Sequence, residues 1–178
     1  MIIWITGITA SGKTTLGERL ENDLKLYGIK VLRLDGDELR RRKKFKNTHS
    51  IKDRWFNLKL IVEIGLEEKK KYEIILVSTV SHLEQMRLYA RNKIKNFHEI
   101  YLSCNPEICE KRDYKLLYNK AKTNQLDKNE VFPGVTEPYQ VSKNPELVLH
   151  TDLETIDQSL NKLRLYCNQN FIIQKSPV

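Results

Sequence analysis

The sequence predicts an α/β protein with a mostly parallel sheet of about five strands. Short apolar runs alternate with helical patterns of ten or more residues, which is typical of β-α-β crossovers. The 178 residues correspond to one domain, and 40% hydrophobic with 30% charged residues argue against global disorder. No apolar run approaches the ~20 residues that a membrane-spanning helix needs, so a membrane protein is not expected.

Each strand is predicted from a short apolar run, and each helix from apolar residues that recur on one face. The expected strands are residues 2–6, 31–34, 74–77, 99–102 and 147–149. The expected helices are residues 13–27, 53–71, 82–94, a helix that begins at Pro106, and residues 154–167. In the first helix, Leu16, Leu20 and Leu24 lie four apart, and Gly28 is typical of a C-terminal stop. Together these elements predict three layers, with helices on both faces of the sheet.

Residues 113–145 differ from the rest of the domain. This segment is polar and rich in Lys and Asn, and it shows periodicity for only one short helix. It also contains four turn-forming residues, Pro133, Gly134, Pro138 and Pro145. A segment of this length without strands of its own is usually functional, disordered or a lid. We interpret it as a lid within a single domain of residues 1–178.

One motif carries the chemistry: residues 7–14, Gly-Ile-Thr-Ala-Ser-Gly-Lys-Thr, match the phosphate-loop pattern G-x-x-x-x-G-K-[ST] in full. The motif lies between a predicted strand and a predicted helix, where a phosphate loop must lie. Gly7 and Gly12 let successive backbone N–H groups converge on phosphate oxygens. Lys13 is expected to reach the β- and γ-phosphates of a nucleotide, and the Thr14 hydroxyl to bind Mg²⁺. A chance match is the alternative, but it is rare at a strand-to-helix junction.

Two carboxylates, Asp35 and Asp37, follow the second predicted strand. Ligands of open parallel sheets bind beyond the carboxyl ends of the strands, so both side chains should face the phosphate loop. One carboxylate could hold Mg²⁺ through water, while the other accepts a proton from an attacking hydroxyl. An ordinary Asp-Gly turn with a helix-capping Asp is the alternative. With a phosphate loop nearby we favour the functional interpretation, and we leave open which carboxylate has which role.

The net charge of +8 favours anionic partners but does not distinguish nucleic acids from nucleotides. Most of the basic run 40–46 is interpreted as a solvated helix face. Arg40 is the exception, because its spacing from Asp37 places it near the site. Three cysteines without metal-ligand spacing and an N-terminus without signal-peptide features predict a cytoplasmic protein with reduced thiols. Neither nucleic acid nor membrane is expected as a partner.

Further sequence blocks resemble the adenylylsulfate kinases, small P-loop kinases that move the γ-phosphate of ATP onto the 3′-hydroxyl of adenylylsulfate. In chain order these blocks are residues 34–37 with Arg40, 50–57, Ser81, 109–113, 115–121, 132–135 and 138–139. Their order and spacing are far more specific than the phosphate loop alone, and they cover nearly the whole chain. The resemblance implies a three-layer P-loop kinase that uses ATP and Mg²⁺ and acts on a small nucleotide acceptor. Because such relatives are often dimers, it also implies a homodimer.

The motif and the resemblance together give the candidate site residues. The catalytic candidates are Lys13, Asp35 and Asp37. The candidates for ATP binding are Gly7, Ala10, Ser11, Gly12, Lys13, Thr14, Thr15 and Arg112, with Thr14 as the metal ligand. The candidates for acceptor binding are Asp37, Arg40, Arg54, Asn57, Ser81, Lys115 and Phe132. Phe132 is expected to stack on the acceptor base. Ser81 is expected to contact the acceptor without becoming phosphorylated, because direct in-line transfer needs no covalent intermediate.

The ATP half matches the family, whereas the acceptor half departs from it. His49 stands where the family has a Phe that stacks on the acceptor base, and His82 where it has a Pro after the pocket serine. Loss of one aromatic face would remove roughly 1–3 kcal/mol of base stacking. The favoured reaction is the phosphorylation of adenylylsulfate (APS to PAPS). One alternative acceptor is cytidine diphosphoramidate, which relatives phosphorylate in capsular polysaccharide phosphoramidate biosynthesis. The other alternative is a nucleotide- or nucleic-acid-binding protein without transfer activity.

Overall fold

Five parallel strands form the centre of the fold, in the order β2-β3-β1-β4-β5. The computed structural model describes residues 1–172, and the six remaining residues of the expected domain lie outside that range. The strands are β1 (Ile2–Thr6), β2 (Val31–Asp35), β3 (Ile74–Ser78), β4 (Phe97–Ser103) and β5 (Leu147–His150). The prediction of a mostly parallel sheet of about five strands is confirmed.

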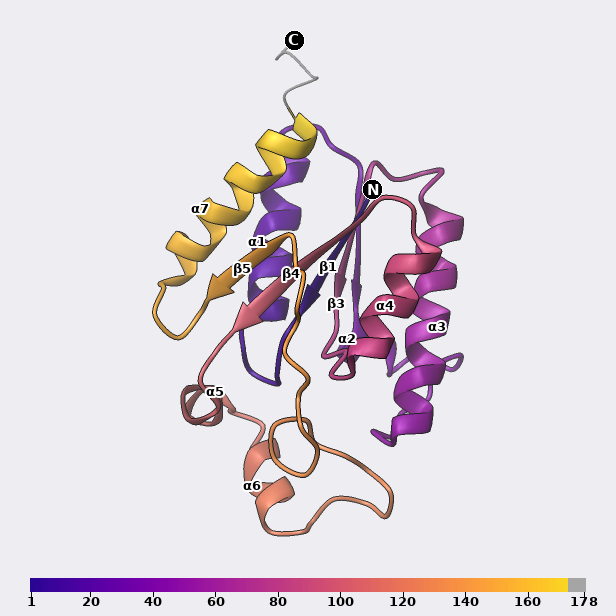
Figure 1. Ribbon diagram of the computed structural model, residues 1–178. Helices are drawn as coiled ribbons and strands as arrows, with labels where there is room; N and C mark the ends of the chain where they lie inside the picture. The colour runs from indigo at the N-terminus through magenta and orange to yellow at the C-terminus, as the bar shows by residue number, and fades with distance from the viewer. Residues whose placement is uncertain (173–178) are drawn as a thin grey trace.

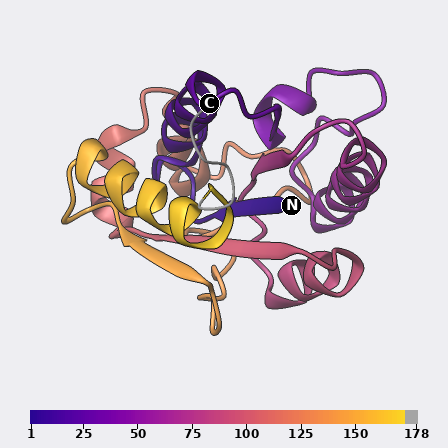
Figure 2. The same ribbon diagram turned by 90° about the horizontal axis from the view of Figure 1, so that it is seen from above.

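Helices cover both faces of the sheet (Figures 1 and 2). The four packing helices are α1 (Lys13–Leu26), α3 (Ile51–Glu68), α4 (Glu84–Lys93) and α7 (Ile156–Cys167). Side chains alternate along a strand, so β1 sends Ile3 and Ile5 into a core shared with α1 and α7. Ile2 and Trp4 enter the opposite core, shared with α3 and α4. The three predicted layers are therefore present.

The segment interpreted as a lid, residues 113–145, lies beyond the carboxyl ends of the strands, on the side to which the arrowheads in Figure 1 point. It follows α5 (Pro106–Arg112), contains α6 (Leu117–Lys122) and returns to β5 as irregular chain. An apolar cluster joins lid and phosphate loop: Ile8, Cys109, Tyr118, Ala121 and Phe132. The Tyr118 hydroxyl also donates a hydrogen bond to the carbonyl of Thr9, at 3.0 Å. The lid thus packs directly on the phosphate loop.

Side-chain caps set two helix boundaries that the sequence patterns missed. Helix α3 begins at Ile51, before the predicted start, because the Ser50 hydroxyl accepts a hydrogen bond from the Asp53 amide. Helix α7 begins at Ile156, two residues later than predicted, because Thr155 and Gln158 form a capping box. The helix implied around the basic run is shorter than expected, because α2 (Gly36–Leu39) is a single turn that ends before residue 40. A short π-helical turn, η1 (Asn168–Ile172), follows α7.

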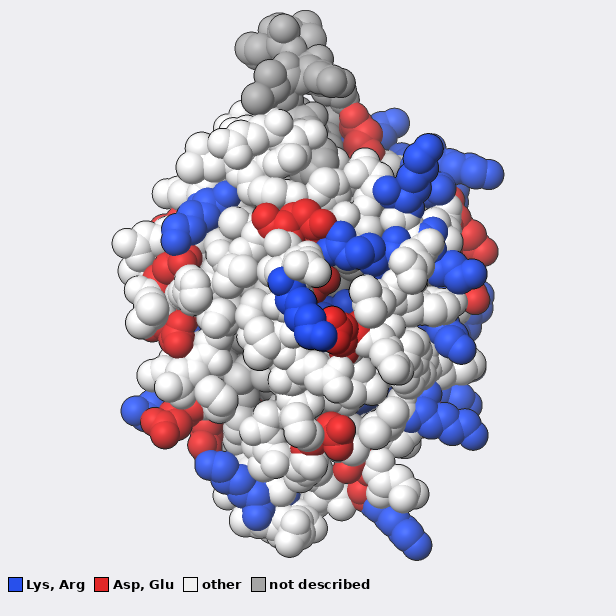
Figure 3. All heavy atoms as spheres, in the orientation of Figure 1, with Lys and Arg blue, Asp and Glu red and all other residues white. Residues whose placement is uncertain are grey.

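Basic side chains are unevenly distributed on the surface. On the face drawn in Figure 3, Lys and Arg gather mostly over the side of α3 and α4, with acidic groups among them. Residues 41–44 of the basic run are exposed, as predicted. They lie in turns and not on a helix, because α2 ends at Leu39 and the buried Phe45 anchors the chain that follows. Among residues 1–172, no helix is both long and apolar enough to cross a membrane.

Candidate active site

The phosphate loop connects β1 to α1 in a conformation that needs small residues. Gly7, Ala10 and Gly12 have positive φ angles of 154°, 61° and 99°. A Cβ atom on Gly7 would lie only 2.7 Å from the carbonyl oxygen of Leu102 on β4. The buried Ser11 hydroxyl has no hydrogen-bond partner within the described chain. Small residues therefore let the loop wrap tightly, and Ser11 fits a loop whose polar groups turn toward a ligand.

Lys13, the first residue of α1, folds back over the phosphate loop. Its ammonium group donates a hydrogen bond to the carbonyl of Ile8, at 2.6 Å. Burial lowers the pKa of Lys13 to about 8, and the nearby carboxylates of Asp37 and Asp35 offset only part of this effect. The charge of Lys13 is therefore only partly neutralised by nearby carboxylates, and a cation of this kind at the N-terminus of a helix is suited to bind phosphate.

The affinity for ATP is expected to fall as the pH rises above about 8. Phosphate oxygens bind the protonated form of Lys13. Above about pH 8 the free protein has lost this proton, so ATP binding must take one up. The affinity should therefore fall by up to about tenfold for each further pH unit. Calorimetric titration with the ATP analogue AMPPNP at about pH 7 and about pH 9 measures the change. In Lys13→Met the decline should be absent, and a similar decline in both proteins would contradict the assignment.

Thr14 and Asp35 form the part of the site best suited to a metal ion. The Thr14 hydroxyl donates to Asp35 Oδ2 at 2.7 Å, and Asp35 is only 3% exposed. The other oxygen of Asp35 caps α2 by accepting from the Asp37 amide at 2.9 Å. Hydroxyl and carboxylate oxygens are ligands that Mg²⁺ prefers, so these two residues fit the ion. Asp35 therefore caps a helix, as the structural interpretation expected, and its contact with the phosphate-loop threonine leaves its role toward Mg²⁺ a prediction.

No group of three or more His, Cys, Asp or Glu within residues 1–172 could hold a metal ion. Mg²⁺ in kinases is usually bound by one or two protein oxygens together with phosphates and water. The pair formed by Thr14 and Asp35 agrees with that arrangement and not with a closed metal site made of protein ligands alone.

Asp37 faces the lid. Its side chain is 63% exposed, and Lys115 at the start of the lid forms an ion pair with it at 3.7 Å. Asp35, by contrast, is buried and fully engaged. Of the two carboxylates, Asp37 is thus the one that a substrate hydroxyl can reach.

Beside this carboxylate lies a small cleft, open to solvent, between α2, α3 and the turn after β3. Its lining residues are Gly36, Arg40, Arg54, Asn57, Leu58, Ile61, Thr79, Ser81, His82 and Met86. The structure brings together four of the residues predicted to bind the acceptor: Arg40, Arg54, Asn57 and Ser81. The apolar residues among the ten come from α3 and α4.

Arg40 and Arg54 make the cleft positive. Arg40 donates to the carbonyls of Lys46 and Thr48, and Arg54 donates to those of His49 and Val131. Neither guanidinium has a carboxylate within ion-pair distance in the described chain. Burial lowers the pKa of Arg40 and lowers that of Arg54 to about 10, with the charge of Arg40 adding to the effect on Arg54. Two poorly compensated cations favour an anionic ligand in this cleft.

Two predicted acceptor residues are occupied by contacts within the protein. The Asn57 amide group is bonded to both the N–H and the carbonyl of Lys46, at 2.9 and 2.7 Å. Phe132 is 6% exposed, and its ring contacts that of Tyr118 edge-on with the centroids 4.8 Å apart. Asn57 thus holds the loop around Lys46 in place. Little of the Phe132 ring is free to stack on a base.

Two residues predicted to bind ATP, Thr15 and Arg112, lie near the carboxyl ends of the strands. Thr15 is exposed on the first turn of α1, next to Thr14. Arg112 is exposed at the end of α5, and it donates to the carbonyl of Thr151 just beyond β5, at 2.8 Å. Both residues therefore lie at the carboxyl side of the sheet.

Sequence reasoning missed the buried ion pair between Arg87 on α4 and Glu99 on β4. Their side chains are 3.1 Å apart, and both are almost fully buried. Arg87 also donates to the carbonyl of Ser81 at 2.7 Å, and therefore supports the cleft. The only signal in the sequence is a charged residue on a helix face that is otherwise apolar, between Met86 and Ala90.

Comparison with known proteins agrees with this geometry. The family model for adenylylsulphate kinase matches residues 1–150 of the chain. The adenylyl-sulfate kinase of Halothermothrix orenii is 35% identical over 167 residues, which cover 94% of this chain and 89% of that protein. The APS kinase of Mycobacterium tuberculosis, solved in complex with AMPPNP and APS, has a TM-score of 0.84 at 30% identity over 94% of this chain and 96% of that chain. The chain therefore belongs to the adenylylsulfate kinase family.

Proposed function

We propose that this protein transfers the γ-phosphate of ATP to the 3′-hydroxyl of adenylylsulfate. The observation that carries the proposal is the position of a cleft lined by the cations Arg40 and Arg54, next to a complete phosphate loop. The similarity to the APS kinase of Mycobacterium tuberculosis, which was solved with both substrate-type ligands, supports the same pairing of sites.

The site residues supply positioning, charge and a proton acceptor. The loop N–H groups and Lys13 bind the β- and γ-phosphates, and Thr14 and Asp35 would hold Mg²⁺. When bound, Mg²⁺ neutralises negative charge on the phosphates. As the bond from the 3′-oxygen to the γ-phosphorus forms, the bond from that phosphorus to the β-phosphate oxygen breaks and ADP leaves. Asp37 takes the proton of the 3′-hydroxyl.

The remaining site residues hold the acceptor and exclude water. Arg40, Arg54 and Lys115 provide positive charge for the anionic tail of adenylylsulfate. Ser81 contributes to the wall of the acceptor cleft, and Arg112 lies near the expected position of ATP. The lid, which packs on the phosphate loop through Tyr118 and Phe132, limits hydrolysis of ATP by water.

The relatives weigh against both alternatives. Those named above are adenylylsulfate kinases, and nothing in the comparisons supports the cytidine diphosphoramidate branch. A protein that only binds nucleotides would not need a cationic acceptor cleft beside the phosphate loop. The homodimer and the cytoplasmic location stay predictions.

An acceptor panel tests the proposed function. Purified protein is incubated with ATP, Mg²⁺ and one of adenylylsulfate, cytidine diphosphoramidate or a plain nucleotide. The formation of ADP and of a 3′-phosphate is followed by coupled assay and ³¹P NMR. We expect acceptor-dependent ADP formation with adenylylsulfate, and its loss when EDTA removes Mg²⁺. Turnover restricted to another acceptor, or salt-sensitive binding of DNA or RNA without any turnover, would refute the proposal.

A further inference from the structure

The turn that follows β3 is held in an unusual backbone conformation. Ser81 has a φ angle of +39°, which non-glycine residues rarely adopt. Its hydroxyl accepts a hydrogen bond from the indole N–H of Trp4 at 3.2 Å, and its carbonyl accepts one from Arg87 at 2.7 Å. A strained turn persists only where its surroundings fix it, and such turns cluster at functional sites.

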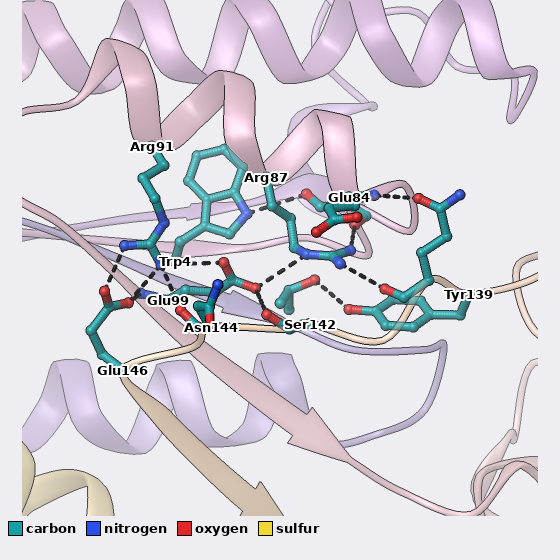
Figure 4. A network of polar contacts seen from close by, with 12 residues as sticks. Trp4, Glu84, Arg87, Arg91, Glu99, Tyr139, Ser142, Asn144 and Glu146 are labelled. Atoms are coloured by element: carbon teal, nitrogen blue, oxygen red, sulfur yellow. Dashed lines mark hydrogen bonds and ion pairs between the residues drawn. The ribbon is translucent and has the colours of Figure 1, made fainter.

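Arg87 is the centre of the network that fixes this turn (Figure 4). It is 2% exposed, pairs with Glu99 at 3.1 Å and donates to the carbonyl of Gln140 at 2.6 Å. Ser142 donates a short hydrogen bond to the same Glu99 carboxylate. Residues 140–142, near the end of the lid segment, are thereby tied to the sheet and to α4. The turn and the end of the lid therefore share one rigid support.

His82 is the next residue of this turn, and its ring has unused hydrogen-bonding capacity. Its backbone carbonyl accepts from the Gln140 amide at 2.9 Å, which holds the residue in place. The residue is 0% exposed, yet neither Nδ1 nor Nε2 has a hydrogen-bond partner in the described part of the chain. A buried polar group without a partner costs about 1–3 kcal/mol and calls for an explanation. His82 also lines the acceptor cleft, so its ring lies next to the space that a bound ligand would occupy.

The environment of the ring defines what it can bind. Burial, together with the positive charges of Arg54 and Arg87, lowers the pKa of His82 to about 4. At neutral pH the ring therefore carries one N–H donor and one nitrogen acceptor. The groups that face it combine cations, Arg40 and Arg54, with the apolar wall at Met86. A donor in such a setting complements an oxygen of a bound anion.

We propose that His82 is a specificity-determining residue that donates a hydrogen bond to the anionic tail of the acceptor, beside Arg40 and Arg54. The inference rests on the proposed function, because it places the tail of adenylylsulfate in this cleft. Pro, which the family resemblance places at this position, has no side-chain donor. A neutral imidazole therefore gives this protein a hydrogen-bond donor with which it can prefer acceptors whose anionic tail offers an oxygen at that position.

Steady-state kinetics of three variants test the inference. His82→Ala and His82→Pro remove the donor, and the KM for adenylylsulfate should rise about 10- to 100-fold, as expected for a hydrogen bond to a charged group. The KM for ATP should stay within about twofold, since the phosphate loop is untouched. His82→Gln keeps a donor and should restore part of the affinity. His150→Ala, which changes an exposed histidine beyond the cleft, is the matched control. An unchanged acceptor KM in folded His82→Ala would overturn the inference.

NMR of the wild-type protein gives a second readout that requires no turnover. The ring nitrogens of ¹⁵N-histidine-labelled protein are followed with Mg-ADP present while inorganic sulfate, and then adenylylsulfate, is added. The His82 signals, assigned from the spectrum of His82→Ala, should shift with both ligands.

The outcomes separate the two proposals. A His82 shift with sulfate in a protein that does not phosphorylate adenylylsulfate would support the inference and contradict the proposed function. Turnover of adenylylsulfate without any shift of the His82 signals would support the proposed function and contradict the inference. An internal water would then be the partner of the ring. If there is neither shift nor turnover, both proposals are wrong.

Discussion

Lys13→Ala is expected to lower kcat for phosphoryl transfer by at least about 10²- to 10³-fold and to leave the fold intact. The ammonium group is a positive charge placed where negative charge develops, and losing one such group typically has an effect of this size. The fold should survive because the side chain makes only one hydrogen bond, to Ile8, in the described chain. Because burial lowers the pKa of Lys13, keeping its ammonium group charged in the folded protein makes folding less favourable, in full below about pH 8.

Initial rates with saturating ATP and adenylylsulfate, together with urea unfolding, measure both parts of this expectation. Lys25→Ala is the matched control, because Lys25 lies on the same helix, far from the phosphate loop, and its half-exposed side chain pairs with Glu21 at 2.7 Å. That control should keep its full rate. If Lys13→Ala retained most of its turnover, the role assigned to the phosphate loop would be wrong.

The centre of the sheet could be predicted from the sequence because β1 and β3 are buried on both faces. Ile74–Ser78, for example, is buried at every residue, so a short apolar run was sufficient to find β3. The phosphate loop could be predicted because its chemistry depends on local spacing, with Gly7, Gly12 and Lys13 within seven positions. Patterns of this kind remain visible in a single sequence.

Contacts between distant segments could not be predicted. The hydrogen bonds between the Asn57 amide group and the backbone of Lys46 were not foreseen, and the role of Asn57 in acceptor binding stays a prediction. The edge-on contact of the Phe132 ring with Tyr118 was not foreseen either, and stacking of Phe132 on the acceptor base stays a prediction. The missing partners of the His82 ring become evident only once the turn, α4 and the end of the lid are assembled. These features follow from tertiary packing, which residue type and spacing do not encode directly.

The same reasoning applies to the buried pair that supports the acceptor cleft. In the sequence, Arg87 and Glu99 are two charged residues 12 positions apart with no visible relation. In the fold they form an ion pair that water barely reaches, with side chains 3% and 4% exposed. Burying such a pair is unfavourable unless its polar atoms are bonded, and here the carbonyls of Ser81 and Gln140 accept from the other two guanidinium nitrogens of Arg87.

Glu99→Ala is therefore expected to lower the free energy of unfolding by about 3–5 kcal/mol, because it leaves the Arg87 guanidinium buried without its carboxylate. The Ser142 hydroxyl loses its acceptor as well. Urea unfolding followed by circular dichroism measures the loss. Glu68→Ala is the matched control, since Glu68 pairs with Lys71 at the surface, and its removal should cost no more than about 1 kcal/mol.

A further variant separates the loss of the pair from the charge left behind. Replacing both residues together, as Arg87→Met with Glu99→Met, removes the uncompensated charge and should recover much of the stability that Glu99→Ala loses. It also removes the hydrogen bond to the carbonyl of Ser81, so the acceptor turn loses its support even in a stable protein. The double variant should thus fold well yet show a raised KM for adenylylsulfate. Full recovery of both stability and acceptor affinity would mean that the pair contributes to folding alone.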